Sequence, residues 1–237
     1  MSSTERQEQL RASVVAAIRE QILDRKIRPG DGLRLNKLAE SLGTSATPVR
    51  EALLLLAQDG WVIHEPNRGF RVAQIRRTDV ADTYFIWATA EGEIAARAAT
   101  RATARDVAVL REIDEQLRAV KPEAGSTATE LNGELHSVIY EIADAPKLEW
   151  FVAAARRLVP FQIPNTFYQV PNWFEENRTA HGPIIDAIAR GETDTARREM
   201  FAHLERTGEM LLDWLDSMEF WSDAAATGRQ RRRTLAG

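Results

Sequence analysis

Residues 29–72 of the chain read PGDGLRLNKLAESLGTSATPVREALLLLAQDGWVIHEPNRGFRV, and this stretch decides the fold of the N-terminal third. It predicts two short helices on either side of Gly43, a residue that suits the left-handed end of the first helix. Ser45 or Thr47 can cap the second helix, and Pro48 is tolerated in its first turn, where a missing N–H costs nothing. The pattern therefore predicts a helix-turn-helix.

Two short strands are predicted next, around residues 61–65 and 70–74, because a tight-turn composition separates two apolar runs. Upstream, apolar residues recur every four positions over residues 10–26 and predict an amphipathic helix. The first nine residues are polar and are expected to be disordered. Three helices followed by a hairpin make a winged helix-turn-helix, which we assign to residues 10–75.

The rest of the chain changes character after a short charged linker, predicted at residues 76–78. In every segment that follows, the apolar residues recur with the period of an α-helix. Residues 79–220 are therefore expected to form an all-α antiparallel bundle, and the chain as a whole is expected to be mainly α. The arginine-rich residues 221–237 are expected to be a flexible tail. The predicted helices cover residues 79–102, 104–119, 128–143, 147–159, 173–190 and 193–217, with loops at 121–127 and 160–171.

The composition excludes several classes of protein. Of the 237 residues, 44% are hydrophobic and 28% are charged, which is typical of a globular chain. The chain has no cysteine, which excludes disulfides and thiolate chemistry, and no apolar run approaches the length of a membrane span. A cytoplasmic protein is expected. The net charge of −4 hides a basic N-terminal third, which suggests a polyanionic partner.

That partner is predicted to be double-stranded DNA. The major groove, about 12 Å wide, admits one helix, and the first turn of that helix meets base edges and phosphates. For Arg50 the structural alternative is a surface salt bridge with Glu51 or Asp59, and for Arg68 it is a solvated turn. The expected DNA-binding residues lie on the two short helices and the hairpin tip: Asn36, Ser45, Thr47, Arg50, Asn67, Arg68 and Gly69.

Three of the four histidines, His136, His181 and His203, fall on three different predicted helices of the bundle. Asn132 precedes His136 by four residues and so shares its helical face. Imidazole is a common ligand of divalent transition metals. Spacing alone leaves two alternatives open, a shared metal site and three separate hydrogen-bonded core histidines.

Residues 10–75 resemble the DNA-binding module of the GntR family of bacterial transcription regulators. The run Thr47-Pro-Val-Arg-Glu-Ala-Leu53 and the run from Asp59-Gly-Trp-Val to Asn67-Arg-Gly69 carry this resemblance at the family's spacing. The chain has Ala46 where many members have an arginine, so one DNA contact of the family pattern is absent.

The bundle resembles the FCD ligand-binding domain of the FadR-like branch of that family. The similar segments are Leu131-Asn-Gly-Glu-Leu-His136, Ala180–Ile188 and Ala196–Leu204. The resemblance implies a metal site of Asn132, His136, His181 and His203, with zinc as the foremost ion and nickel or manganese as alternatives.

The resemblance also implies a homodimer, an organic-acid effector and, most commonly, repression. Arg156 and Arg157 are the candidate countercharges for the effector. The chain departs from the family pattern in having Asn132 where aspartate is frequent and Trp87 where arginine is frequent. Pro183 predicts that the helix holding His181 starts or kinks there.

The sequence thus predicts a DNA-binding regulator that responds to a metabolite. One alternative is a metal-dependent enzyme built on the three histidines, but the chain has no His-Glu-x-x-His, Gly-x-Ser-x-Gly or phosphate-loop motif. Another is a DNA-binding protein whose bundle only dimerises.

Overall fold

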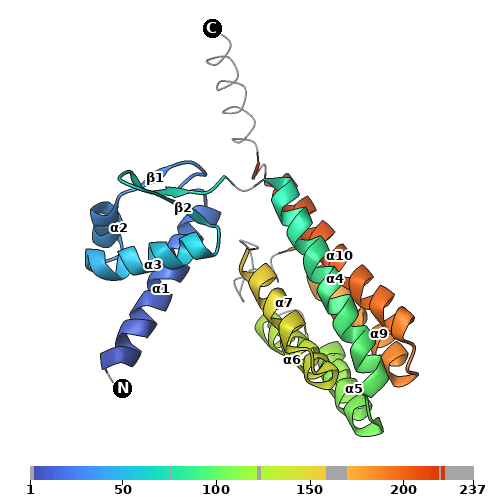
Figure 1. The fold of residues 1–237 in the computed structure, drawn as a ribbon. Helices are drawn as coiled ribbons and strands as arrows, with labels where there is room; N and C mark the ends of the chain where they lie inside the picture. Colours follow the sequence, from blue (N-terminus) through green and yellow to red (C-terminus); the bar gives the residue numbers. More distant parts are fainter. Residues whose placement is uncertain (1–2, 75, 122–123, 159–169, 219, 222–237) are drawn as a thin grey trace. The chain divides into compact units, whose positions relative to one another are not determined.

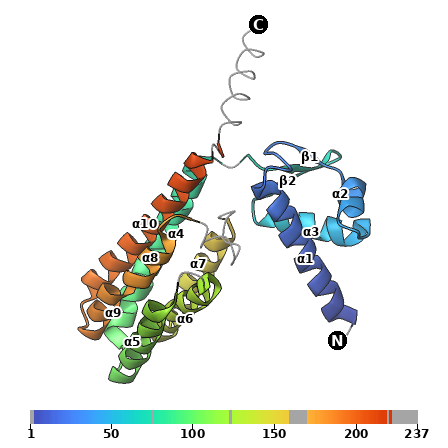
Figure 2. The same ribbon diagram turned by 180° about the vertical axis from the view of Figure 1, so that it is seen from behind.

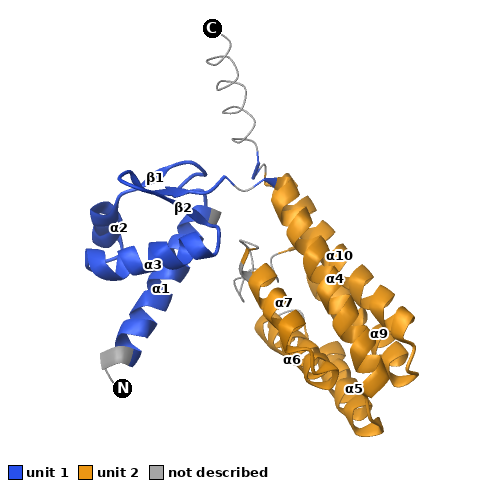
Figure 3. Cartoon of the chain, viewed as in Figure 1, with its two compact units in different colours: residues 1–76, 220–237 blue, residues 77–219 orange. Residues whose placement is uncertain are grey.

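The computed structural model describes residues 3–74, 76–121, 124–158, 170–218 and 220–221. The chain divides into two compact units (Figure 3), Met1–Arg76 together with Phe220–Gly237, and Arg77–Glu219. No helix in the described ranges has both the length and the apolar character that a membrane crossing requires.

The N-terminal unit is a three-helix fold with a small antiparallel sheet (Figure 1). The strand order is β1-β3-β2, with His64 opposite Phe70 and Leu33 opposite Phe70 on the other edge. This is the predicted winged helix-turn-helix. Its elements are α1 (Ser3–Leu23), β1 (Gly32–Leu33), α2 (Leu35–Ser41), α3 (Ala46–Gln58), β2 (Val62–Glu65) and β3 (Gly69–Val72).

The core of this unit forms where α1 packs against α3. Ile18, Leu53 and Leu56 are fully buried there, as the helical spacing predicts, and Trp61 closes the core from the start of the hairpin. The charged side chain that joins these elements is Arg19. It pairs with Asp59 at 2.7 Å and lies over the indole of Trp61, so it fixes α1 to the end of α3.

Three expectations for this unit need correction. Helix α1 begins at Ser3, so residues 3–9 are helical and not disordered, because their Glu, Gln and Arg residues favour an exposed helix. The two-residue strand β1 was not predicted, since a run this short carries no alternation. Ser45 stands at the N-cap of α3, but its side chain makes no capping hydrogen bond.

The second unit is all-helical, as predicted. Its two longest helices, α4 and α10, lie side by side in both views (Figures 1 and 2), and α4 also packs against α6, α7 and α9. The helices are α4 (Arg77–Arg101), α5 (Ala104–Ala119), α6 (Gly125–Ala143), α7 (Pro146–Leu158), α8 (Trp173–Thr179), α9 (His181–Ala189) and α10 (Thr193–Ser217).

The close approach of α4 and α10 depends on two glycines. A Cβ on Gly208 would lie 2.7 Å from the ring of Tyr84, and a Cβ on Gly92 would lie 3.0 Å from the backbone oxygen of Arg197. A side chain at Gly208 would therefore push the two helices apart. One contact joins the first half of α4 to the second half of α10 and the other joins the second half of α4 to the first half of α10, so the two helices pack antiparallel over much of their length.

The predicted helix boundaries change at three places. Helix α4 begins at Arg77, so the linker predicted at residues 76–78 is mostly helical. Helix α6 begins at Gly125, three residues before its predicted start. The helix predicted at 173–190 is two helices, α8 and α9, and Pro183 lies in the first turn of α9, where proline is tolerated. Most of the predicted 160–171 loop and nearly all of the arginine-rich tail lie outside the described residues.

Candidate metal centre and nucleic-acid interface

The first turns of α3 present the polar side chains that were predicted to meet DNA. Ser45, Thr47 and Arg50 are all exposed, and Val49 between them is fully buried. The buried residue fixes the helix in the unit, and its polar neighbours therefore face solvent from the N-terminal turn. Asn36, in the first turn of α2, is exposed as well.

The side chain of Arg50 forms neither of the salt bridges weighed against DNA contact. Within the described residues, Asp59 pairs with Arg19, and Arg50 has no ion pair with Glu51. The guanidinium is therefore available to a phosphate or a base edge.

The hairpin tip has a tightly turned backbone. Asn67 and Gly69 have φ values of 63° and 85°, in the left-handed region that asparagine and glycine tolerate best. Arg68 between them is exposed, and no ion pair joins it to another described residue. Arg71, on β3, pairs with Glu65 of β2 at 3.4 Å. The remaining histidine, His64, stacks on Phe70 at 4.6 Å.

The structure brings the three bundle histidines together. His136 from α6, His181 from α9 and His203 from α10 are 6%, 0% and 1% exposed. One ring nitrogen of each lies within 4.8 Å of the others. Of the two alternatives left open by spacing, this convergence favours a shared site over three separate core histidines.

Several polar atoms around this cluster are buried without a hydrogen bond among the described residues. They are both ring nitrogens of His181, Nδ1 of His203 and Oδ1 of Asn132, which lies one helical turn before His136. Burying an unsatisfied polar atom costs about 1–3 kcal/mol. A neutral imidazole has one nitrogen lone pair, so three imidazoles and one amide oxygen offer the donor types that suit a divalent cation.

The electrostatics of the cluster favour neutral imidazoles at His181 and His203. Burial, and then the nearby charge of His136, lower the pKa of His181 to about 3. Burial also lowers the pKa of His203 well below its ordinary value, and the charges of His181 and His136 add to this effect. Both rings are therefore neutral at neutral pH, and a neutral imidazole is the form that binds a metal.

A carboxylate that no motif marked as functional completes the cluster. Glu91 of α4 is 1% exposed, and its Oε2 lies 2.6 Å from Nδ1 of His136. Its other oxygen accepts hydrogen bonds from the indole of Trp87 and the hydroxyl of Tyr140. The only sequence signal was helical spacing, since Trp87 and Glu91, like His136 and Tyr140, are four residues apart.

These contacts decide the ionisation of Glu91. Burial opposes its negative charge, but the charge of His136 and the hydrogen bonds from His136, Tyr140 and Trp87 together lower its pKa. The buried carboxylate is therefore ionised. Burial and the charge of Glu91 raise the pKa of Tyr140 well above its ordinary value. The phenol therefore keeps its proton and donates a hydrogen bond to Glu91.

Of the two arginines proposed as countercharges, Arg156 lies near this network. Its guanidinium lies over the ring of Trp87, 5.7 Å from the ring centre, and its charge lowers the pKa of Tyr140 against the larger effects above. The side chain of Arg157 lies outside the described part of the structure.

Comparison with known proteins gives matches over both units. The model of the FCD domain matches residues 82–206, and that of the gntR family of bacterial regulatory proteins matches residues 10–72. The first match contains all three histidines and Glu91, and the second contains the whole of the α2–α3 region and the hairpin.

Individual relatives are similar over most of their length. An uncharacterised HTH-type transcriptional regulator of Mycobacterium tuberculosis is 29% identical over 208 residues, covering 84% of this chain and 80% of the relative. The HTH-type transcriptional repressor RspR of Escherichia coli K12 is 26% identical over 193 residues, covering 81% and 84%.

Solved structures agree with the fold. The structure of E. coli McbR/YncC matches with a TM-score of 0.58 at 25% identity, covering 86% of this chain and 97% of that chain. The structure of Lar, which controls the expression of the Listeria monocytogenes agr system, matches with a TM-score of 0.60 at 19% identity. It covers 85% of this chain and 97% of that chain, and it shows similarity of fold alone.

Proposed function

Because the chain belongs to the GntR family of bacterial regulatory proteins and carries an FCD domain, it is a DNA-binding transcription regulator and not an enzyme, and we propose that a metal-centred effector site controls its binding to operator DNA. The observation that carries this proposal is the buried cluster of His136, His181 and His203 with unsatisfied ring nitrogens. A regulator of chromosomal DNA works in the cytoplasm.

The DNA-binding surface in this proposal is the exposed first part of α3 together with the hairpin tip. Arg50 contacts phosphate or a base edge from the major groove, and Ser45 and Thr47 reach the same groove from the helix start. Arg68 contacts the backbone beside the minor groove. Two copies read two half-sites, because a single winged helix-turn-helix covers too little DNA for high specificity.

The metal ligands are Asn132, His136, His181 and His203, with zinc as the expected ion and nickel or manganese as alternatives. A bound ion would supply a Lewis-acidic centre that attracts a carboxylate or another anionic group. Glu91 accepts the hydrogen from Nδ1 of His136, which fixes the tautomer and leaves Nε2 as the donor toward the ion.

The effector is proposed to be a small organic acid. Arg156 supplies a positive charge near Trp87 and the buried network of Glu91. Binding of the acid at this site fixes α6, α9 and α10 relative to one another. The acid then controls the protein only if the affinity for operator DNA differs between the acid-free and the acid-bound arrangement of these helices. RspR is a repressor, and repression is the mode we propose here.

A two-stage experiment tests this function. Genomic fragments enriched by the purified protein identify the operator, and fluorescence anisotropy then measures its affinity for the metal-loaded protein with and without citrate, malate and related acids. The proposal expects specific fragments and at least one acid that changes the affinity about fivefold or more. A protein that enriches no specific fragment contradicts the operator assignment, and a protein that selects an operator but responds identically before and after chelation contradicts the metal-centred control.

A further inference from the structure

The face of α3 that is proposed to meet DNA carries a large apolar side chain. In the run of leucines at residues 53–56, Leu53 and Leu56 are fully buried in the core of the winged unit, whereas Leu54 is 41% exposed. Leu54 lies one helical turn after Arg50 and one turn before Gln58, and both of these residues are exposed as well. The three side chains therefore lie in one line along the outer face of the helix.

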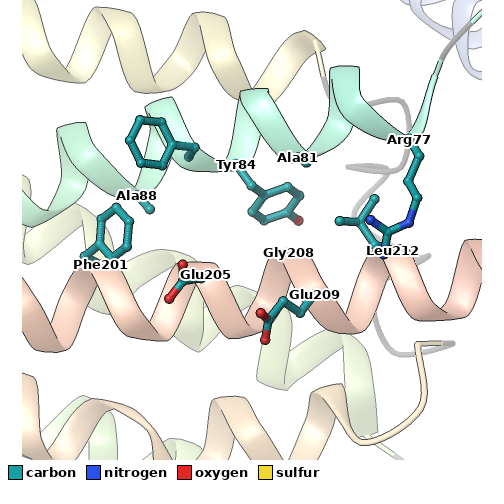
Figure 4. A pocket seen from close by; sticks show the side chains of 10 residues that line it. Arg77, Ala81, Tyr84, Ala88, Phe201, Glu205, Gly208, Glu209 and Leu212 are labelled. Carbon is teal, nitrogen blue, oxygen red and sulfur yellow. The ribbon is translucent and has the colours of Figure 1, made fainter.

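An exposed leucine is ordinary at a protein surface, so it is the position of Leu54 that matters. In the second unit, the exposed Phe85 has an apolar setting on its own chain. It lies edge-on to Phe201, and both rings line a groove of about 270 Å³ between α4 and α10 (Figure 4). Leu54 instead stands between an arginine and a glutamine, on the surface that the proposed function places against DNA.

The major groove of DNA offers an apolar side chain a limited choice of partners. Its walls are charged phosphates, and most groups on its base edges are hydrogen-bond donors or acceptors. A leucine pressed against such a group would leave it buried without a hydrogen bond, which weakens binding. The apolar group on these edges is the 5-methyl of thymine, and it distinguishes thymine from every other base.

We infer that Leu54 packs against the methyl group of a thymine in each half-site and so helps to determine which sequence the regulator selects. This inference rests on the proposed operator binding and adds the identity of one base to it. Leu54 lies about 6 Å beyond Arg50 along the helix, at 1.5 Å per residue, and base pairs are stacked about 3.4 Å apart. With α3 lying in the groove, the thymine is about two base pairs from the position that Arg50 contacts.

A contact with another protein is the other use for an exposed leucine on this face. A protein seated on Leu54 would also cover Arg50, which lies one turn away on the same line, and it would therefore compete with DNA. The contact with thymine uses both side chains at once. The two uses differ in a measurable way, because only a contact with DNA makes the affinity depend on a single methyl group.

Replacement of thymidine by deoxyuridine tests the inference, since deoxyuridine keeps every hydrogen-bonding group of thymidine and lacks only the methyl. The full-length wild-type protein first selects its operator from a pool of random duplexes, and each thymidine of one half-site is then replaced in turn. In fluorescence anisotropy, one replacement should weaken wild-type binding about threefold to fivefold, the effect of one buried methyl group. The same replacement should have almost no effect on Leu54→Ala, because alanine is too short to reach the methyl.

Two further variants sharpen the test. Leu54→Gln should change the preferred base at that position from thymine to adenine, because glutamine reads adenine with two hydrogen bonds. The matched control is Leu10→Ala, since Leu10 is 43% exposed on α1 and lies outside the face of α3. This control should distinguish thymidine from deoxyuridine as the wild type does. Circular dichroism should match the wild type for all variants, because both leucines lie outside the buried core.

The possible failures are distinguishable. A wild-type protein that selects an operator but binds it equally well with deoxyuridine at every position overturns the inference and leaves the proposed function intact. A Leu54→Ala protein that still distinguishes the two nucleotides as the wild type does has the same consequence. A selection that yields no preferred sequence rejects the proposed function and this inference together.

Discussion

Nδ1 of His136 lies 2.6 Å from Oε2 of Glu91, and both side chains are almost completely buried. This contact joins α6 to α4 and orients the imidazole whose neighbours on α9 and α10 complete the cluster. Because Trp87 and Tyr140 also donate to Glu91, the carboxylate stays ionised in the interior. The contact therefore fixes the orientation of the His136 ring, as a carboxylate does for a histidine that binds a metal.

Removing the metal should destabilise the bundle. An ion present at 100 times its dissociation constant adds about 2.7 kcal/mol, so chelation should lower the unfolding temperature of the wild type by roughly 5–10 °C. Differential scanning calorimetry with and without EDTA measures this shift. His203→Ala should show no response to EDTA, whereas His64→Ala, on the hairpin, should respond like the wild type. An unfolding temperature of the wild type that is indifferent to EDTA and to added zinc contradicts the prediction.

Glu91→Gln should weaken metal binding by about 10–100-fold with little change in shape. An amide keeps one acceptor but replaces the other with a donor, so it cannot accept from His136, Tyr140 and Trp87 together. Competition with a chromophoric zinc chelator gives the dissociation constant. Glu93→Gln is the control, because Glu93 is on the same helix and pairs with Arg97 and Arg197 away from the histidines. Equal affinities for the two variants would rule out the positioning role of Glu91.

Arg50→Ala should weaken operator binding strongly while the protein stays folded, because the side chain is exposed and has no ion pair among the described residues. If the contact is to a phosphate, the slope of log affinity against log salt should also fall by about one unit. Fluorescence anisotropy over a salt series measures both. Arg105→Ala, an exposed arginine of α5, serves as the control and should bind as the wild type does. Unchanged affinity for Arg50→Ala would remove this residue from the interface.

The start of α5 offers a test of the fold that does not involve function. Thr103 and Asp106 form a capping box, in which the backbone N–H of Thr103 donates to Asp106 at 2.8 Å and the backbone N–H of Asp106 donates to the Thr103 hydroxyl. Thr103→Ala should lower the unfolding temperature by about 2–4 °C, and Thr103→Ser should retain most of the stability. Equal unfolding temperatures for all three proteins would show that the cap contributes nothing.

Much of the architecture was predictable because it follows from local signals. The period of apolar residues located α5, α7 and α10 to within one residue, and Pro183 marked the start of α9. Boundaries failed where no such signal exists. Helix α1 begins as early as Ser3 because its first residues are polar helix formers, which add nothing to the apolar pattern. The break at Ala180 between α8 and α9 was missed because the apolar period continues across it almost unchanged.

The site was predictable in part for a related reason. The three histidines were recognisable from their segments, but the convergence of their rings depends on how α6, α9 and α10 pack, which spacing along one chain does not determine. Glu91 was missed as a partner of His136 because the contact joins residues 45 positions apart. The groove between α4 and α10 was also beyond prediction, since its floor depends on a contact between Gly208 and Tyr84 across two helices.

The central claim, that the three buried histidines hold a divalent metal ion, is tested most directly by its stoichiometry. The protein is purified without a metal-affinity resin and dialysed against a weak chelator, and its metal content is measured by inductively coupled plasma mass spectrometry. We expect about one zinc, nickel or manganese ion per wild-type chain and almost none in His203→Ala. A wild-type chain that carries no such ion, even after loading with each metal, or a His203→Ala chain that carries as much as the wild type, would contradict the claim.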